Sequence, residues 1–180
     1  MSGVPEHPPP SMQVYLSAKK YLWKDEDKAI SEQVGKIIGV DGDSERRFNG
    51  SSLVVKEITL DAMYWRKANA IHGWFVNNVQ DGEDDCKEYE VEREQLETLR
   101  DSCSKILARH EAMKTMTDDE LEEMDDLDED EESLEPTEGF FFGSTDKDEW
   151  YYQDLKNTVE GLDRVLALPD QYSFSYQASW

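Results

Sequence analysis

Apolar residues recur every three or four positions in four stretches of the chain, which is the spacing of one face of a helix. The first stretch ends at Gly39, the second spans 62–79, the third covers about 92–110, and the last begins near Thr145. Asp61 precedes the second stretch and is a suitable N-cap. The predicted apolar faces are, in chain order, Ala29, Ile30, Val34, Ile37 and Ile38; Trp65, Ala68, His72, Phe75 and Val79; Leu96, Leu99, Cys103, Ile106 and His110; and Tyr151, Leu155, Val159, Leu162 and Leu166.

Period-two alternation and β-branched residues predict strands outside these helices. Residues 53–60 have the pattern of a half-buried strand, and aromatic and polar residues alternate between 172 and 176. Shorter extended segments are expected at 89–91, at 14–16 and at 21–23. This combination predicts an α+β fold with about four helices and a small, mostly antiparallel sheet.

The length of 180 residues is typical of one domain. Residues 1–12 are rich in proline and are expected to form a flexible tail, which leaves 13–180 as a single α+β domain. Within that domain, 13 acidic residues and no basic residue fall in the segment 118–135. Because such a run of like charges repels itself, we expect a disordered acidic insert over 114–136.

The net charge of the chain limits the kinds of molecule that it is expected to bind. There are 42 acidic and 19 basic residues, which gives a formal net charge of −23. Direct binding to nucleic acid is disfavoured, because phosphate contacts require a basic surface. The apolar runs are far too short to span a bilayer, so no membrane partner is expected. With two cysteines and no secretory pattern at the start, the expected localisation is cytoplasmic.

Two blocks of sequence resemble one family. Residues 64–76 read YWRKANAIHGWFV, and residues 139–145 read GFFFGST, followed by DEWYY at 148–152. Cys86 and Tyr89 also fit the pattern. The blocks are similar to the signature of a family of small proteins encoded by bacteriophages, prophages and other mobile elements. The resemblance implies a phage-like origin and a compact α+β domain, but no settled activity and no catalytic residues.

The usual signatures of enzymes and metal proteins are missing from the sequence. There is no Walker loop and no Gly-x-Ser-x-Gly elbow. Asp126, Asp128 and Asp130 match the first ligands of an EF-hand loop, but Glu131 stands where the loop needs glycine and Thr137 where it needs glutamate. The cysteines and histidines lack zinc-site spacing. We therefore predict no catalytic residues, no metal and no cofactor.

The segment around Arg66 and Lys67 is the best candidate for a ligand site. Guanidinium, amide and aromatic groups together suit a nucleotide-like ligand, and a glycine turn beside them would let backbone approach a phosphate. The alternative is that the aromatic residues and His72 belong to the core, while Arg66 and Lys67 pair with acids. The candidate ligand-binding residues are Trp65, Arg66, Lys67, Asn69, His72, Gly143, Ser144 and Thr145.

Two hypotheses for function follow from these observations. The first is a non-enzymatic phage-type accessory protein in the host-cell cytoplasm, which binds a basic host or phage protein through its acidic surface. DNA mimicry, or inhibition of a nucleic-acid-handling or defence system, would be forms of that role. Its candidate contact residues are Leu121, Met124, Leu127, Asp125, Asp126 and Asp128. The alternative is a nucleotide-like ligand-binding protein or enzyme. The oligomeric state stays open.

Overall fold

The protein combines helices with one antiparallel sheet, as the sequence predicts. The computed structural model describes residues 12–40, 53–117, 134 and 147–179. Its elements are β1 (Gln13–Tyr21), the 3₁₀ turn η1 (Asp25–Asp27), α1 (Lys28–Ile37), β2 (Glu57–Arg66), α2 (Asn69–Asn78), β3 (Glu88–Val91), α3 (Arg93–Met113), α5 (Glu149–Leu166) and β4 (Ser173–Ser179). The four strands are antiparallel in the order β2-β1-β4-β3, so the fold is α+β.

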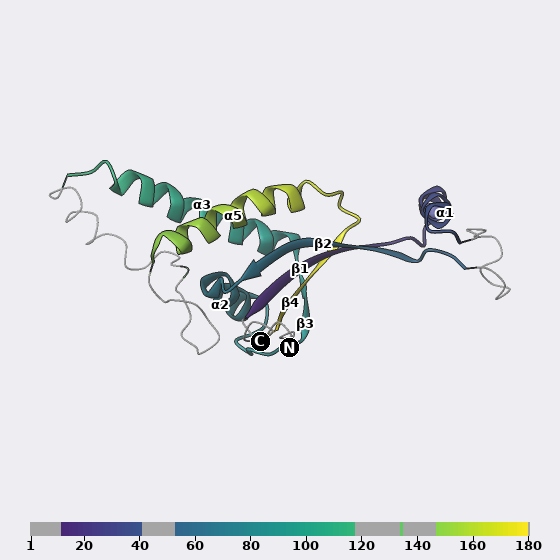
Figure 1. Cartoon of the computed structure of the whole chain (residues 1–180), viewed down its shortest axis with the longest axis horizontal. Helices are drawn as coiled ribbons and strands as arrows, with labels where there is room; N and C mark the ends of the chain where they lie inside the picture. The colour runs from purple at the N-terminus through teal and green to yellow at the C-terminus, as the bar shows by residue number, and fades with distance from the viewer. Residues whose placement is uncertain (1–11, 41–52, 118–133, 135–146, 180) are drawn as a thin grey trace, which may run out of the picture.

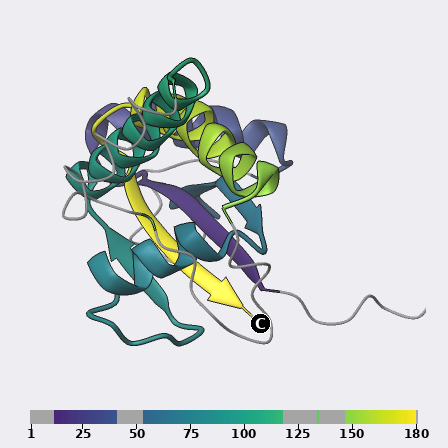
Figure 2. The ribbon, with the colours of Figure 1, turned by 90° about the vertical axis from the view of Figure 1, so that its left-hand side faces the viewer.

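Helices α3 and α5 lie over one face of the sheet (Figures 1 and 2). Side chains on alternate positions of the central strands point into this layer, among them Leu16 of β1 and its cross-strand partner Tyr176 of β4. They belong to one fully buried cluster with Leu99 of α3 and Leu155 of α5. Helix α2 contributes to the same core, because its buried Phe75 stacks on Tyr176.

The helix predicted over 62–79 is wrong in its first part. Residues 57–66 form β2, which pairs with β1 along its whole length from Gln13 opposite Arg66 to Tyr21 opposite Glu57. The strand predicted at 53–60 is therefore displaced towards higher residue numbers, and Asp61 lies inside it rather than capping a helix. Cross-strand pairing with a nine-residue partner outweighs the local helical spacing, because β-branched and aromatic residues here suit a strand equally well. Helix α2 starts only at Asn69.

The other predicted elements differ mainly at their ends. The segments at 14–16 and 21–23 belong largely to one strand, β1. Helix α5 begins at Glu149 instead of near Thr145, because the Asp148 carboxylate accepts hydrogen bonds from the backbone N–H groups of Trp150 and Tyr151, each at 3.0 Å. This is the N-cap geometry expected of aspartate. Thr145 itself lies outside the described residues.

Most of the predicted tail and acidic insert lies outside the described residues. Leu134 is an informative exception within the predicted insert: it is buried, and its carbonyl accepts a hydrogen bond of 3.0 Å from the Tyr151 hydroxyl. This residue is thus attached to the start of α5. None of the helices that the structure describes is long and apolar enough to cross a membrane.

Candidate functional site

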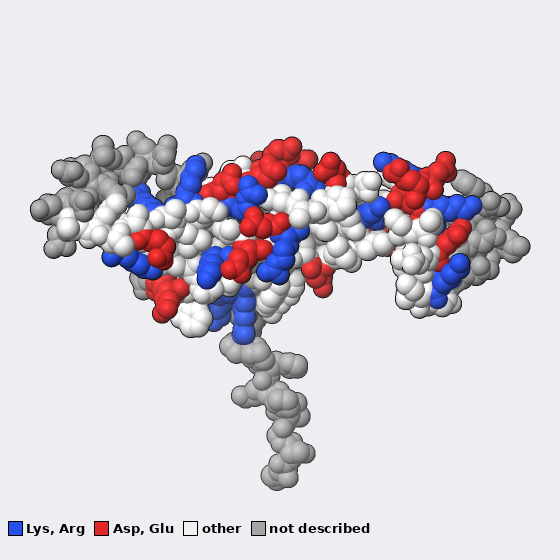
Figure 3. Space-filling model, turned by 90° about the horizontal axis from the view of Figure 1, so that it is seen from above, with Lys and Arg blue, Asp and Glu red and all other residues white. Residues whose placement is uncertain are grey.

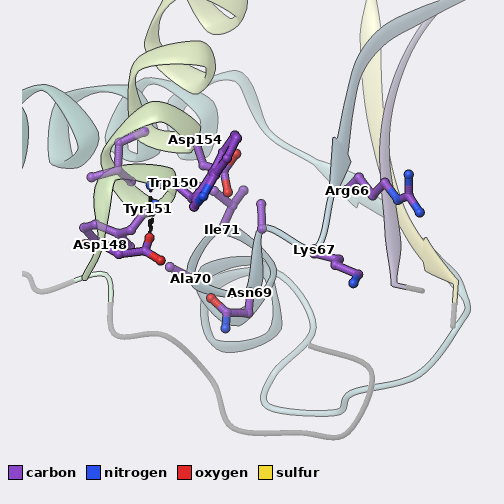
Figure 4. A pocket seen from close by; sticks show the side chains of 11 residues that line it. Arg66, Lys67, Asn69, Ala70, Ile71, Asp148, Trp150, Tyr151 and Asp154 are labelled. Atoms are coloured by element: carbon purple, nitrogen blue, oxygen red, sulfur yellow. Dashed lines mark hydrogen bonds between the residues drawn. The ribbon is translucent and has the colours of Figure 1, made fainter. Parts of the chain in front are cut away.

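A pocket of about 350 Å³ lies where the N-terminal ends of α2 and α5 meet (Figure 4). Its walls come from the β2–α2 connection on one side and from the first two turns of α5 on the other. The lining residues are Arg66, Lys67, Ala68, Asn69, Ala70, Ile71, Asp148, Trp150, Tyr151, Asp154 and Leu155. A volume of this size is at the lower end of the range for small-ligand sites.

Two features of the chain position the segments that line this pocket. Lys67 adopts a left-handed backbone conformation, with φ of 60°, so that the chain turns sharply from β2 into α2. In addition, the Trp65 indole N–H donates a hydrogen bond of 2.9 Å to the Thr158 hydroxyl, which donates one of 2.7 Å to the Asp154 carbonyl. Because Trp65 and Thr158 are buried, this chain of bonds fixes β2 against α5.

One carboxylate in the pocket wall, that of Asp154, has a raised pKa. Burial of this carboxylate raises its pKa to about 6, and the negative charge of Asp148 adds to the shift. None of the described side chains forms an ion pair with the Asp154 carboxylate or donates a hydrogen bond to it. A half-buried carboxylate normally has such a partner, since losing water without one is unfavourable.

An exposed aromatic side chain stands next to this carboxylate. Trp150 precedes Asp154 by one helical turn, so the two residues share a face of α5. The Trp150 side chain is 78% exposed although it lines the pocket. In Figure 4 the side chains of Arg66 and Lys67 extend away from Asp148, Trp150 and Asp154. The region beside α5 is therefore acidic and aromatic.

Three of the candidate ligand residues meet in the pocket and two do not. Arg66, Lys67 and Asn69 line it. Trp65 is instead a buried bridge to Thr158, and His72 is fully buried and absent from the lining. Gly143, Ser144 and Thr145 lie outside the described residues, as do the candidate contact residues Leu121, Met124, Leu127, Asp125, Asp126 and Asp128.

His72 connects the core to the loop that follows α2. Its Nε2 lies 3.0 Å from the Asp84 carboxylate, and its Nδ1 is hydrogen-bonded to the buried Tyr176 hydroxyl. A carboxylate only accepts, so Nε2 carries the proton and Nδ1 accepts from Tyr176. Burial lowers the pKa of His72, with Asp84 opposing the shift, and burial raises the pKa of Tyr176. This arrangement matches the core alternative for His72, because the neutral imidazole is satisfied at both nitrogens.

A second candidate surface is the arm, by which we mean the far ends of β1 and β2 together with η1 and α1. It projects from the sheet, with α1 at its tip (Figure 1). A buried ion pair of 3.1 Å between Lys20 and Asp27 joins β1 to η1, and the Ser31 hydroxyl donates a hydrogen bond of 2.9 Å to the Val55 carbonyl. The arm therefore has its own polar attachments, which orient α1.

Helix α1 exposes its apolar face. Its buried residues are Ser31 and Gly35, whereas Ile37 is 77% and Ile38 61% exposed. The predicted core stripe is therefore exposed at Ile37 and Ile38 and half-buried at Val34, while the small Ser31 lies against the chain at Val55. Nearby in sequence, the rings of Tyr21 and Trp23 stack at 5.5 Å, and Trp23 is 69% exposed.

The surface above α3 and α5 carries charges of both signs (Figure 3). Arg100, for example, pairs with Asp101 at 2.8 Å and with Asp163 at 3.8 Å. Among the described residues there is no group of three or more histidine, cysteine or acidic side chains placed to hold a metal ion. The aspartates that resemble part of an EF-hand lie outside these residues.

Sequence reasoning missed Asp148, Trp150 and Asp154 as pocket residues. Asp148 and Trp150 stand out in the sequence only as part of the DEWYY block, and Asp154 is one acid among 42. The available signal was the spacing of Trp150 and Asp154, which places both away from the apolar stripe of the helix. It also missed Trp23, whose exposure depends on the projecting arm.

Comparisons with known proteins do not assign a family or a function to this chain. No protein-family model, no curated protein and no solved structure matches the chain.

Proposed function

We propose that this chain is a non-enzymatic binding protein that docks onto a partner protein through the tip of its arm. The observation that carries the proposal is the pair of exposed isoleucines at the C-terminal end of α1, Ile37 and its C-cap Ile38, on a helix whose buried residues are the small Ser31 and Gly35. An amphipathic helix presented in this way suits insertion into an apolar groove of another protein.

The arm supplies suitable anchors for such an interface. Trp23, Ile37 and Ile38 are large side chains that retain most of their exposure in the free protein. Burying each of them contributes about 1.5–3 kcal/mol. Tryptophan is also enriched among the residues that dominate binding energy. Because the Lys20–Asp27 pair and the Ser31 hydrogen bond orient α1 beforehand, little additional ordering is needed on binding.

The proposal also includes the kind of protein that serves as the partner. The resemblance to proteins of mobile elements suggests a host or phage protein, and the excess of acid in 118–135 suggests that this protein is basic. Attraction to that segment would speed association, while the arm would supply the apolar contact. Inhibition of a nucleic-acid-handling or defence system is one form of this role. The mixed charges above α3 and α5 give no support to DNA mimicry by that face.

The proposal is tested by quantitative affinity capture from nuclease-treated host lysate, with variants that separate the two contributions. We expect one stoichiometric protein with the wild type, loss of that protein with Ile37→Glu/Ile38→Glu, and weaker, salt-sensitive capture after deletion of 118–135. Met113→Glu at the end of α3 is the matched control, because Met113 is an exposed apolar residue outside the arm. Equal capture by the arm variant and the control would contradict the proposal.

The nucleotide-like alternative receives less support from the pocket. Asp148 and Asp154 oppose a phosphate beside α5, and His72 and Trp65 do not line the cavity. Measurement of binding to adenosine and guanosine nucleotides would decide this alternative directly.

A further inference from the structure

We propose that the pocket between α2 and α5 binds an organic cation, an ammonium or guanidinium group, which pairs with the Asp154 carboxylate and lies against the Trp150 indole. This site is separate from the arm and does not depend on the proposed docking function. The ligand is either a free amine or a lysine or arginine side chain of another protein, since both offer the same cationic group.

The first step in the argument is the state of Asp154. Its carboxylate has lost part of its hydration, yet within the described chain it has neither a cationic partner nor a hydrogen-bond donor. Asp148 adds a second negative charge nearby. An unpaired carboxylate in such a place is unfavourable, and an incoming cation with N–H donors would supply both missing interactions.

The second step excludes an anion from the same position. The N-terminus of α5 is already occupied, because the Asp148 carboxylate accepts the N–H groups of Trp150 and Tyr151. The side chains of Arg66 and Lys67 extend away from this end of the pocket (Figure 4). A phosphate or carboxylate beside Asp154 would therefore meet repulsion from Asp154 and Asp148, and the capped terminus of α5 would not offset it.

The third step concerns Trp150. A side chain of this size that is 78% exposed and also lines a cavity has a face available for contact. Cations are attracted to the face of an indole, and tryptophan is the best of the aromatic residues for this interaction. The volume of about 350 Å³ suits one side chain or a small amine.

The experiment is an NMR titration of the full chain that follows the Trp150 indole N–H, which is identified by its absence in Trp150→Phe. The probes are agmatine as a free cation, N-acetyl-arginine amide as a protein-like cation, N-acetyl-citrulline amide as its neutral counterpart, and inorganic phosphate. We expect saturable shifts with a cation, and none with citrulline or phosphate. Tighter binding of the blocked arginine than of agmatine would assign the site to a protein side chain, and the reverse order to a free amine.

Two variants of α5 separate the site from general charge effects. Asp154→Asn removes one negative charge from the pocket, and Glu160→Gln makes the same change on an exposed position of the same helix. We expect Asp154→Asn to weaken binding at least tenfold and Glu160→Gln less than twofold. Asp154→Asn should also raise Tm at pH 7.5, because it removes an unpaired charge, so its loss of binding would not reflect misfolding.

Three results would overturn the proposal. The first is unchanged binding by Asp154→Asn, the second is equal shifts with citrulline and arginine amides, and the third is a response of the Trp150 indole to phosphate but to neither cation. Each of them would show that Asp154 does not select positive charge in this pocket.

Discussion

The hydrogen bond between Tyr176 and His72 offers the sharpest test of the core, and we predict that Tyr176→Phe destabilises the protein. Both side chains are fully buried. The substitution keeps the aromatic ring, which stacks on Phe75 with a centroid distance of 4.0 Å and an interplanar angle of 14°. It removes only the hydroxyl group, so the change in stability reports on the polar interaction.

The expected loss of stability follows from the hydrogen bonds that the His72 imidazole can still make without the Tyr176 hydroxyl. Its Nε2–H is committed to the Asp84 carboxylate at 3.0 Å, so Nδ1 must remain an acceptor. Moving the proton to Nδ1 would place two acceptors opposite each other at Nε2. A buried acceptor without a donor costs about 1–3 kcal/mol, and we expect a decrease of that size in the free energy of unfolding.

The assay is urea unfolding at pH 7.5, followed by tryptophan fluorescence and by far-ultraviolet circular dichroism. Tyr172→Phe on the same C-terminal segment is the control, because the Tyr172 hydroxyl has no hydrogen-bond partner among the described residues. His72→Leu and the double variant complete a cycle, in which we expect the two losses to overlap by about 1 kcal/mol or more. A Tyr176→Phe protein as stable as Tyr172→Phe would refute the reasoning.

Further predictions concern titration, reactivity and packing. Burial lowers the pKa of His72 below its ordinary 6.5, so this residue takes up a proton in the unfolded state before it does so in the folded state. In urea titrations, the wild type should therefore lose stability relative to His72→Leu as the pH falls below about 6.5. Asp154 has the opposite effect on the pH dependence of stability, because its pKa of about 6 exceeds the ordinary 3.8. Asp154→Asn should be more stable than wild type by about 1–2 kcal/mol above pH 6, and this difference in the free energy of unfolding should shrink between pH 6 and pH 4. Burial raises the pKa of the Cys103 thiol to about 12, so a thiol reagent at pH 8 should label one cysteine per native chain, the exposed Cys86, and two after denaturation. A side chain at Gly161 would place Cβ against Met63 Cε and 2.8 Å from Met63 Sδ, so the end of the Met63 side chain would have to move. Gly161→Val should therefore lower the free energy of unfolding by about 1–3 kcal/mol, and Met63→Ala should restore part of it.

The sequence correctly predicts the elements whose apolar periodicity fits only one type of secondary structure. The stripes of α3 and α5 lie on the covered side of long helices, and their buried members include Leu96, Leu99, Leu155 and Leu162. Trp65 is buried in a strand, yet its spacing to Ala68 also fits a helix, so local pattern alone does not separate β2 from α2. Pairing with β1 decides the matter, and it joins Trp65 to Val14, which is far away in the sequence.

Periodicity also does not reveal which side of a helix is covered. The apolar stripe of α1 follows the expected spacing, but the buried residues of this helix are the small Ser31 and Gly35. The candidate site shows a similar limit. Arg66, Lys67 and Asn69 were found from one short segment, whereas the pocket also needs α5 from the far end of the chain. An unpaired carboxylate such as Asp154 is visible only once its neighbours are known.

The two proposed sites lie at opposite ends of β2, and this arrangement has a consequence for how they work. Arg66 at the end of β2 borders the pocket, while Glu57 at its start lies in the arm. A strand of ten residues separates them by about 30 Å. Substitutions this far apart, without shared partners, usually add in their effects on stability. Ile37→Glu and Asp154→Asn should therefore have additive effects on stability. If a partner occupies both sites, coupling between the two substitutions should appear only in its affinity, because the partner itself then provides the connection.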